Sequence, residues 1–398
     1  MCIPNTHRKE KNQYIPFLYL MSVFNIVLGP FISRWNGFVD ELIVLLLFIF
    51  GYRSLNFKKN KELYIAAGIL TFFLIYSLAR GENIYKAAIL DFLLFTKPII
   101  SFFLPYFIPF QISENQKKIF RSISFLLCFV CLLQLPYISD IYENTTHYYP
   151  CCIISAMSYL FFSRFAKNDW LFFFLFLTPG LAAIRAKFFT EYIFAIFIVF
   201  FLRERIKINF KWVLRICLIA VVAIYVNIDK FVQYFIIGVD EKMARTMTYF
   251  VVPSIIVDYF PLGPGFGTFN TEAAAQFYSP LYIKYDLDNI YGLSESDYRT
   301  ESDFLHDTFY PVLAQFGILG FFFYGWFWLR RWYDSYALDF NYYRLFIIIF
   351  FIMVIENIAA NSFTGPECIP YMMLLGMMCC SKKHKIHDRN YKIELNNE

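Results

Sequence analysis

The chain has 398 residues, of which 59% are hydrophobic and 17% are charged, and its formal net charge is +5. Soluble domains usually carry about 25% charged residues, so this composition excludes a water-soluble globule of this length. The basic residues stand in short clusters between apolar runs. That pattern is typical of membrane topology signals and argues against nucleic acid as a partner.

Apolar segments that could enter a bilayer recur along almost the whole chain. We predict an all-α, polytopic integral membrane protein of about twelve transmembrane helices. The first span follows the basic start HRKEK without a small-residue cleavage site, so we expect it to stay uncleaved. The expected spans are 13–30, 37–52, 62–79, 87–109, 119–138, 150–164, 169–184, 188–202, 212–226, 309–329, 342–360 and 367–380.

The basic residues predict which side of the membrane each connection faces. About 25 of the 36 Lys and Arg residues fall on alternate connections, together with both termini, and about 10 fall on the other side. Because cytoplasmic loops are enriched in Lys and Arg, we expect both termini to be cytoplasmic.

Polar residues inside the expected spans should face the interior of the bundle, because they are costly in lipid. Asp91 and Lys97 share one span, and Glu356 with Asn357 lies in another, near its extracytoplasmic end. Asp91 and Lys97 are six positions apart, which favours a structural role over a shared site.

The segment PGLAAIRAKFFTEY, between two apolar spans, predicts a hairpin at the extracytoplasmic face with Arg185 at its tip. Lys187 and Glu191 follow with i,i+4 spacing, which places them on one helical face. An arginine at the headgroup level is the alternative interpretation of Arg185.

The connection 227–308 is the longest, and we predict a small, mostly helical extracytoplasmic subdomain. Its Arg245 is one of about five basic residues among about twelve acids, so it belongs to no general basic surface. The stretch PLGPGFG predicts a tight structural turn. One integrated membrane domain results: residues 1–226 carry nine spans, 227–308 the loop, and 309–398 three spans and a cytoplasmic tail.

His306 is the only histidine of this loop and precedes the next span by one turn. Asp303 and Asp307 are within helical reach to orient its imidazole. An unperturbed pKa near 6.5 suits His306 to proton abstraction, although a lone histidine is more often a structural residue.

The order of these features resembles the O-antigen polymerase and O-antigen ligase superfamily. The resemblance covers about residues 170–325: the hairpin IRAKFF, a loop with an arginine and then PLGPGFGTF, and HDTFYPVLAQFGILG opening the next span. Two positions depart from the family pattern. Ile184 precedes Arg185 where serine is usual, and Asp307 follows His306 where asparagine is usual.

The resemblance implies a GT-C-like enzyme of the bacterial cytoplasmic (inner) membrane, acting at its extracytoplasmic face on glycans linked through pyrophosphate to a polyprenyl lipid. Arg185 and Arg245 would stabilise the departing diphosphate without a metal, since a guanidinium holds phosphate oxygens bidentately. His306 would accept the proton of the attacking sugar hydroxyl. The other polar residues expected at the substrate are Lys187, Glu191, Asp303, Asp307 and Glu356. No cofactor is expected, because the pyrophosphate leaving group carries the activation energy.

The leading interpretation is a polymerase that joins polyprenyl-pyrophosphate-linked oligosaccharide repeat units into a surface polysaccharide. Its expected partners are this substrate and membrane lipids, with a chain-length regulator and a flippase left open. A ligase of the same superfamily is one alternative. A polysaccharide flippase or secondary transporter is another, although transporters usually show internal repeats and midplane polar residues.

Overall fold

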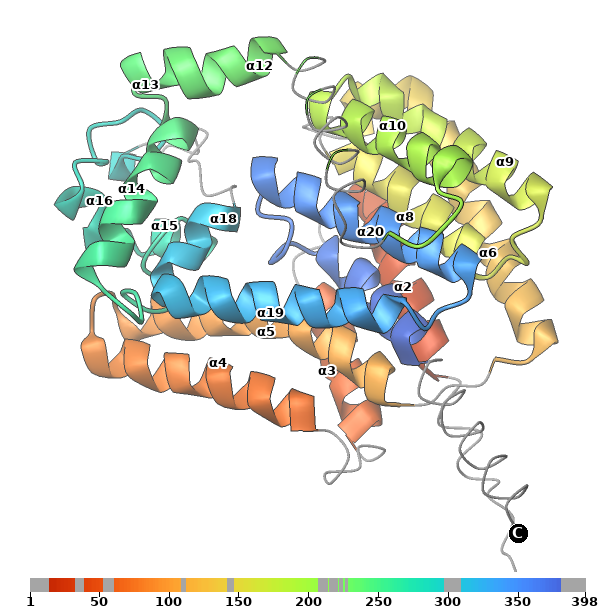
Figure 1. The fold of residues 1–398 in the computed structure, drawn as a ribbon, viewed down its shortest axis with the longest axis horizontal. Coiled ribbons are helices and arrows are strands. Elements are labelled where there is room, and N and C mark those ends of the chain that lie inside the picture. The colour runs from red at the N-terminus through yellow and green to blue at the C-terminus, as the bar shows by residue number, and fades with distance from the viewer. Residues whose placement is uncertain are drawn as a thin grey trace, which may run out of the picture.

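The computed structural model describes residues 14–32, 39–52, 61–108, 112–141, 147–206, 228–296 and 309–380, with Leu214, Val221 and Tyr225 as single residues. Most of these residues are helical, and no strand occurs among them (Figure 1). The all-α class expected from the apolar runs is therefore confirmed.

The first half of the chain forms two groups of packed helices. In the first group, α3 packs between α2 and α5, and α4 packs on α5. Its elements are α2 (Tyr14–Leu28), the 3₁₀ helix η1 (Gly29–Ile32), α3 (Val39–Tyr52), α4 (Lys61–Arg80) and α5 (Tyr85–Phe107). In the second group, α8 packs between α6 and α9. Its elements are α6 (Glu114–Gln134), η3 (Leu135–Tyr137), α7 (Ile138–Ile141), α8 (Tyr148–Phe161), α9 (Lys167–Leu177), η5 (Thr178–Ala183) and α10 (Ala186–Phe201).

Local sequence signals explain where some of these helices begin. At the start of α6, the Ser113 hydroxyl accepts a hydrogen bond from the Gln116 backbone, and the Gln116 side chain accepts one from the Ser113 backbone. This reciprocal cap satisfies two donors that a helix leaves without partners. The polar residues Ser113 and Gln116 thus determine where α6 begins, ahead of the apolar run that follows.

The last third of the chain contributes α18 (Phe309–Val312), η7 (Leu313–Phe316), α19 (Gly317–Ser335), α20 (Phe340–Ala359) and the helix Cys368–Cys380. In Figure 1, α19 lies alongside α5, while α20 lies at the centre of the view. α20 packs against α10, α8 and α18, so it connects the second helix group to the C-terminal helices.

Five stretches are long and apolar enough to cross a membrane: Lys61–Arg80, Tyr85–Phe107, Glu114–Ile141, Phe309–Ser335 and Phe340–Ile358. Large apolar side chains such as Ile75, Leu171 and Phe322 are exposed on the helix surfaces, as expected of surfaces that face lipid. Helices lie in eleven of the twelve stretches expected to span, but the number of spans stays a prediction beyond these five. The ninth stretch, 212–226, falls almost wholly outside the described residues.

Residues 228–296, here called the cap, form short helices around a second, smaller apolar core that includes Ile255, Phe269 and Tyr282. Its helices are α12 (Ile228–Val232), the π-helix η6 (Gln233–Ile237), α13 (Gly238–Asp240), α14 (Ala244–Asp258), α15 (Glu272–Gln276) and α16 (Pro280–Lys284). Arg245 lies in α14.

The turn PLGPGFG fastens the cap to the helix bundle through its backbone. Gly267 N donates to Asp91 Oδ2 (2.8 Å), and the Gln315 side chain donates to the same oxygen (2.8 Å). Phe266 N donates to Ser77 Oγ (2.7 Å). The turn is therefore structural, as expected.

Two polar residues of α5, Asp91 and Lys97, are buried in the interior of the bundle, as expected. Asp91 is fully buried and holds the cap turn. Lys97 lies six residues further along α5 and donates to Asp40 (2.7 Å) and Glu41 (2.8 Å) in the first turn of α3. Both face the interior, because each polar group finds its partners there.

Candidate functional site

The candidate site begins at the tight turn between η5 and α10. Ile184 has left-handed backbone angles (φ 50°, ψ 44°), and Arg185 is extended (φ −105°, ψ 124°) as the N-cap of α10. The Ile184 side chain is 80% exposed, whereas the Arg185 Nε atom is shielded from solvent. Arg185 therefore stands at a helix N-terminus, where backbone dipoles favour anions.

Lys187 connects this turn to α20. Its Nζ atom lies 2.9 Å from Glu356 Oε2, and both side chains are largely buried, with 17% and 6% exposed. The Ser362 hydroxyl donates to the same Glu356 oxygen (2.9 Å). The ammonium group also lies over the Tyr149 ring of α8, 5.2 Å from its centroid.

Glu191 lies one helical turn beyond Lys187 on α10, and only 1% of it is exposed. Its carboxylate interacts with the Glu356 carboxylate and with the Lys187 ammonium group. The expected common face of Lys187 and Glu191 is therefore confirmed, and that face packs on α20.

The helix that carries Arg245, α14 of the cap, binds the same end of α20 through Tyr249. Arg245 lies in the first turn of α14, one turn before Tyr249, whose hydroxyl donates to the Ile358 carbonyl oxygen (2.7 Å). Glu356 precedes Ile358 by two residues. The turn that carries Arg185 and the helix that carries Arg245 therefore both bind residues 356–358 of α20. The first binds through Lys187 and the second through Tyr249.

His306, Asp303 and Asp307 lie outside the described residues. The described chain resumes at Phe309 in α18, which packs against α20 and α14. These two helices carry Glu356 and Arg245, so the chain that follows His306 returns to the elements of the candidate site.

Sequence reasoning missed Tyr149 and Ser362 as members of this cluster. Tyr149 lies in an almost continuous apolar run, and Ser362 lies in a turn that no motif marks. Only their contacts with Lys187 and Glu356 identify them. Among the described residues, no group of three or more His, Cys, Asp or Glu side chains has the arrangement of a metal site.

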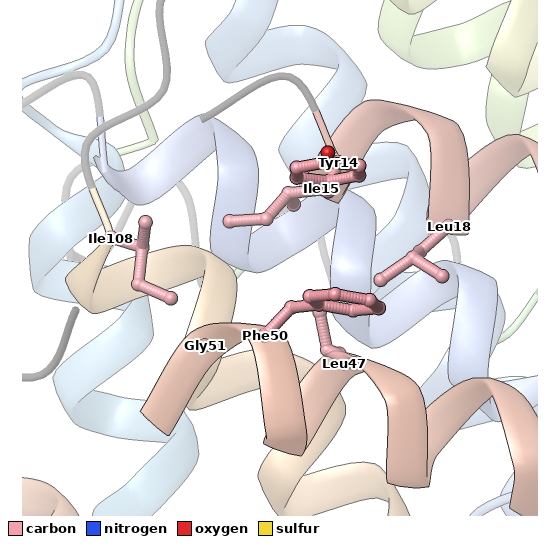
Figure 2. A pocket seen from close by; sticks show the side chains of 7 residues that line it. All are labelled: Tyr14, Ile15, Leu18, Leu47, Phe50, Gly51 and Ile108. Atoms are coloured by element: carbon pink, nitrogen blue, oxygen red, sulfur yellow. The ribbon is translucent and has the colours of Figure 1, made fainter. Parts of the chain in front are cut away.

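Two other polar or concave regions have simpler explanations. Arg331 is buried among the Phe102, Phe103, Tyr106 and Phe327 rings and pairs with Glu62 and Asp334, which ties α19 to α4. A small apolar pocket lies at the end of the bundle opposite the cap. Figure 2 shows the residues that line it: Tyr14, Ile15, Leu18, Leu47, Phe50, Gly51 and Ile108. The pocket has no charged side chain in its lining.

Comparisons with models of protein families, with curated protein sequences and with solved structures found no match.

Proposed function

We propose that the chain is a polymerase that joins polyprenyl-pyrophosphate-linked oligosaccharide repeat units into a surface polysaccharide. The observation that carries this proposal is the shared anchoring of the Arg185 turn and the Arg245 helix on residues 356–358 of α20. Each of the two helices that bind this segment carries an arginine in or just before its first turn. Two such guanidinium groups suit a ligand with two linked phosphates, because each can bind phosphate oxygens bidentately.

The proposed reaction is a metal-independent glycosyl transfer. A hydroxyl oxygen of the acceptor glycan attacks the anomeric carbon of the donor, whose bond to the diphosphate oxygen breaks. His306 accepts the hydroxyl proton, with Asp303 and Asp307 orienting its imidazole, while Arg185 and Arg245 stabilise the charge of the departing polyprenyl diphosphate.

The proposed topology is about twelve spans, with both termini in the cytoplasm and the cap outside the cytoplasmic membrane of a bacterium. The distribution of Lys and Arg residues supports this orientation. The cap binds Tyr76 near the end of α4, Asn83 in the connection to α5, and Ile358 near the end of α20. The candidate site lies at that end of α20, which agrees with a site at the extracytoplasmic surface.

Arginine variants test the proposal, scored by the length distribution of polymer in a deletion strain and by membrane-integrated protein. We expect Arg185→Ala and Arg245→Ala to abolish polymer, and the Arg→Lys variants to restore it only in part. Arg80→Ala is the matched control, because Arg80 also lies at the cap end but pairs with Glu82 and the Tyr259 ring. His306→Gln should lower turnover by about 10²- to 10⁴-fold.

The deletion strain separates the alternatives. Single repeat units on the carrier lipid outside the cytoplasm identify a polymerase. Finished polymer left on that lipid would identify a ligase, and repeat units held on the cytoplasmic side would identify a flippase. Wild-type polymer in both arginine-to-alanine variants would overturn the roles of the two cations.

Transport is the second candidate function, and one observation favours it. Lys97 is buried within α5 with Asp40 and Glu41, and buried charged groups within spans are typical of transporters. The test uses a strain whose carrier lipid still receives repeat units. Loss of glycan export in Lys97→Met would support transport.

A further inference from the structure

The contact between α10 and α20 contains two buried carboxylates and more acceptor oxygens than donors. Glu191 is 1% exposed and Glu356 is 5% exposed. Glu356 Oε2 receives hydrogen bonds from Lys187 and Ser362, each 2.9 Å long. In the described part of the chain, Glu356 Oε1 and both oxygens of Glu191 are buried without a hydrogen bond of ordinary geometry.

The charges of this contact do not balance if both carboxylates are ionised. The groups that act on Glu191 are Glu356 and Lys187. Tyr149 of α8 and Tyr371 of the helix Cys368–Cys380 lie near the same carboxylates, and Glu367 lies near these two rings. None of the three adds positive charge. One ammonium group therefore faces two carboxylates.

A second buried anion without a counterion is strongly unfavourable, and two carboxylates that share a site do not both ionise. We infer that Glu191 and Glu356 hold one proton between them. Glu356 remains the ionised partner of Lys187. Glu191 is the carboxylic acid, with its proton directed to Glu356 Oε1, and the contact as a whole is neutral.

This proton-binding site is independent of any glycosyl transfer. The proton lets Glu356 keep Lys187 in place, and Lys187 is two residues from Arg185. Without the proton, the two negatively charged carboxylates would repel each other and weaken the contact between α10 and α20. Glu191 is thus a positioning residue for the turn that carries Arg185.

Neutral replacements test the assignment, because glutamine resembles a carboxylic acid in shape and charge. In purified full-length protein, Glu191→Gln should keep the thermal stability of the wild type, and it should stay stable at alkaline pH where the wild type weakens. Glu356→Gln is the matched variant. It leaves Lys187 without its counterion, so we expect it to lose most of its folded protein.

Infrared spectra provide a direct readout. The carbonyl stretch of a protonated carboxyl group should appear in the wild type and be absent in Glu191→Gln, and the difference spectrum separates Glu191 from other buried acids. An unchanged spectrum, or a Glu191→Gln variant that does not fold, would overturn the inference. Thermal stability that rises with sodium but not with choline at equal ionic strength would also overturn it, since a metal cation would then occupy the site.

Discussion

The cap turn and the Arg185 turn both contain left-handed backbone, but they achieve it differently. In PLGPGFG the positive φ angles belong to Gly263, Gly265 and Gly267, so the backbone is unstrained. At the Arg185 turn the same region is occupied by Ile184, a β-branched residue for which it is costly. The cap turn requires glycine, because neighbouring atoms leave no room for a Cβ atom at these three positions. The Arg185 turn instead keeps a strained residue beside a candidate functional cation.

Their polar groups differ in the same way. The backbone N–H groups of Gly265, Phe266 and Gly267 in the cap turn donate to Gln315, Ser77 and Asp91, respectively. Beside the Arg185 turn, two carboxylates are buried with a single lysine. The glycine-rich turn therefore attaches the cap to the bundle, and the Arg185 turn carries the candidate chemistry.

The largest effect on this comparison is expected from Gly267→Ala. A Cβ atom there would lie 2.6 Å from the Ala87 carbonyl carbon, and φ is +71°. We expect a loss of about 3 kcal/mol in stability, since both overpacking and an unfavourable φ contribute. Thermal unfolding in detergent measures it. Gly68→Ala in α4, with open space around its Cβ position, is the control and should fold normally. Equal stability of the two variants would contradict the fastening role.

A smaller effect of opposite sign is expected from Ile184→Asn. Asparagine tolerates the left-handed region, and the 80% exposed isoleucine side chain loses little packing. Stability should rise by about 1 kcal/mol. The same substitution at Ile283, which is exposed but helical, should bring no gain. A loss of stability in Ile184→Asn would show that the isoleucine side chain itself is required.

The smallest effect is expected on the stability of the cap at acidic pH, through the exposed residue Asp258. Hydrogen bonds from Tyr285 (2.9 Å) and Lys284 (3.2 Å) hold the pKa of Asp258 below its ordinary value. A lowered folded-state pKa adds stability above the unfolded-state pKa of about 3.9, and this is lost as the pH falls through the folded-state value. Hydrogen exchange of residues 255–285 should therefore quicken slightly in acid. Asp258→Asn should remove that pH dependence, and an unchanged profile would assign it to another group.

Much of the helix layout could be predicted, because an apolar backbone in a membrane must satisfy its own hydrogen bonds and does so as a helix. The interior positions of Asp91 and Lys97 followed from the cost of charge in lipid. The i,i+4 spacing placed Lys187 and Glu191 on one face, which is a property of the helix alone.

The partners of these residues could not be predicted. Lys187 meets Glu356 across 169 positions of sequence, and Tyr249 reaches the Ile358 carbonyl across 109. Neither pair leaves a periodic or local signal, because each depends on which helices pack together.

The sequence by itself thus determined an all-α chain with membrane-spanning helices and buried charges, since hydropathy and helical periodicity are local properties. Only the tertiary structure decided that α10 and Tyr249 of α14 contact the same end of α20, which residues the turn PLGPGFG binds, and that Glu191 and Glu356 share one lysine. Such pairings depend on the packing of side chains from distant helices.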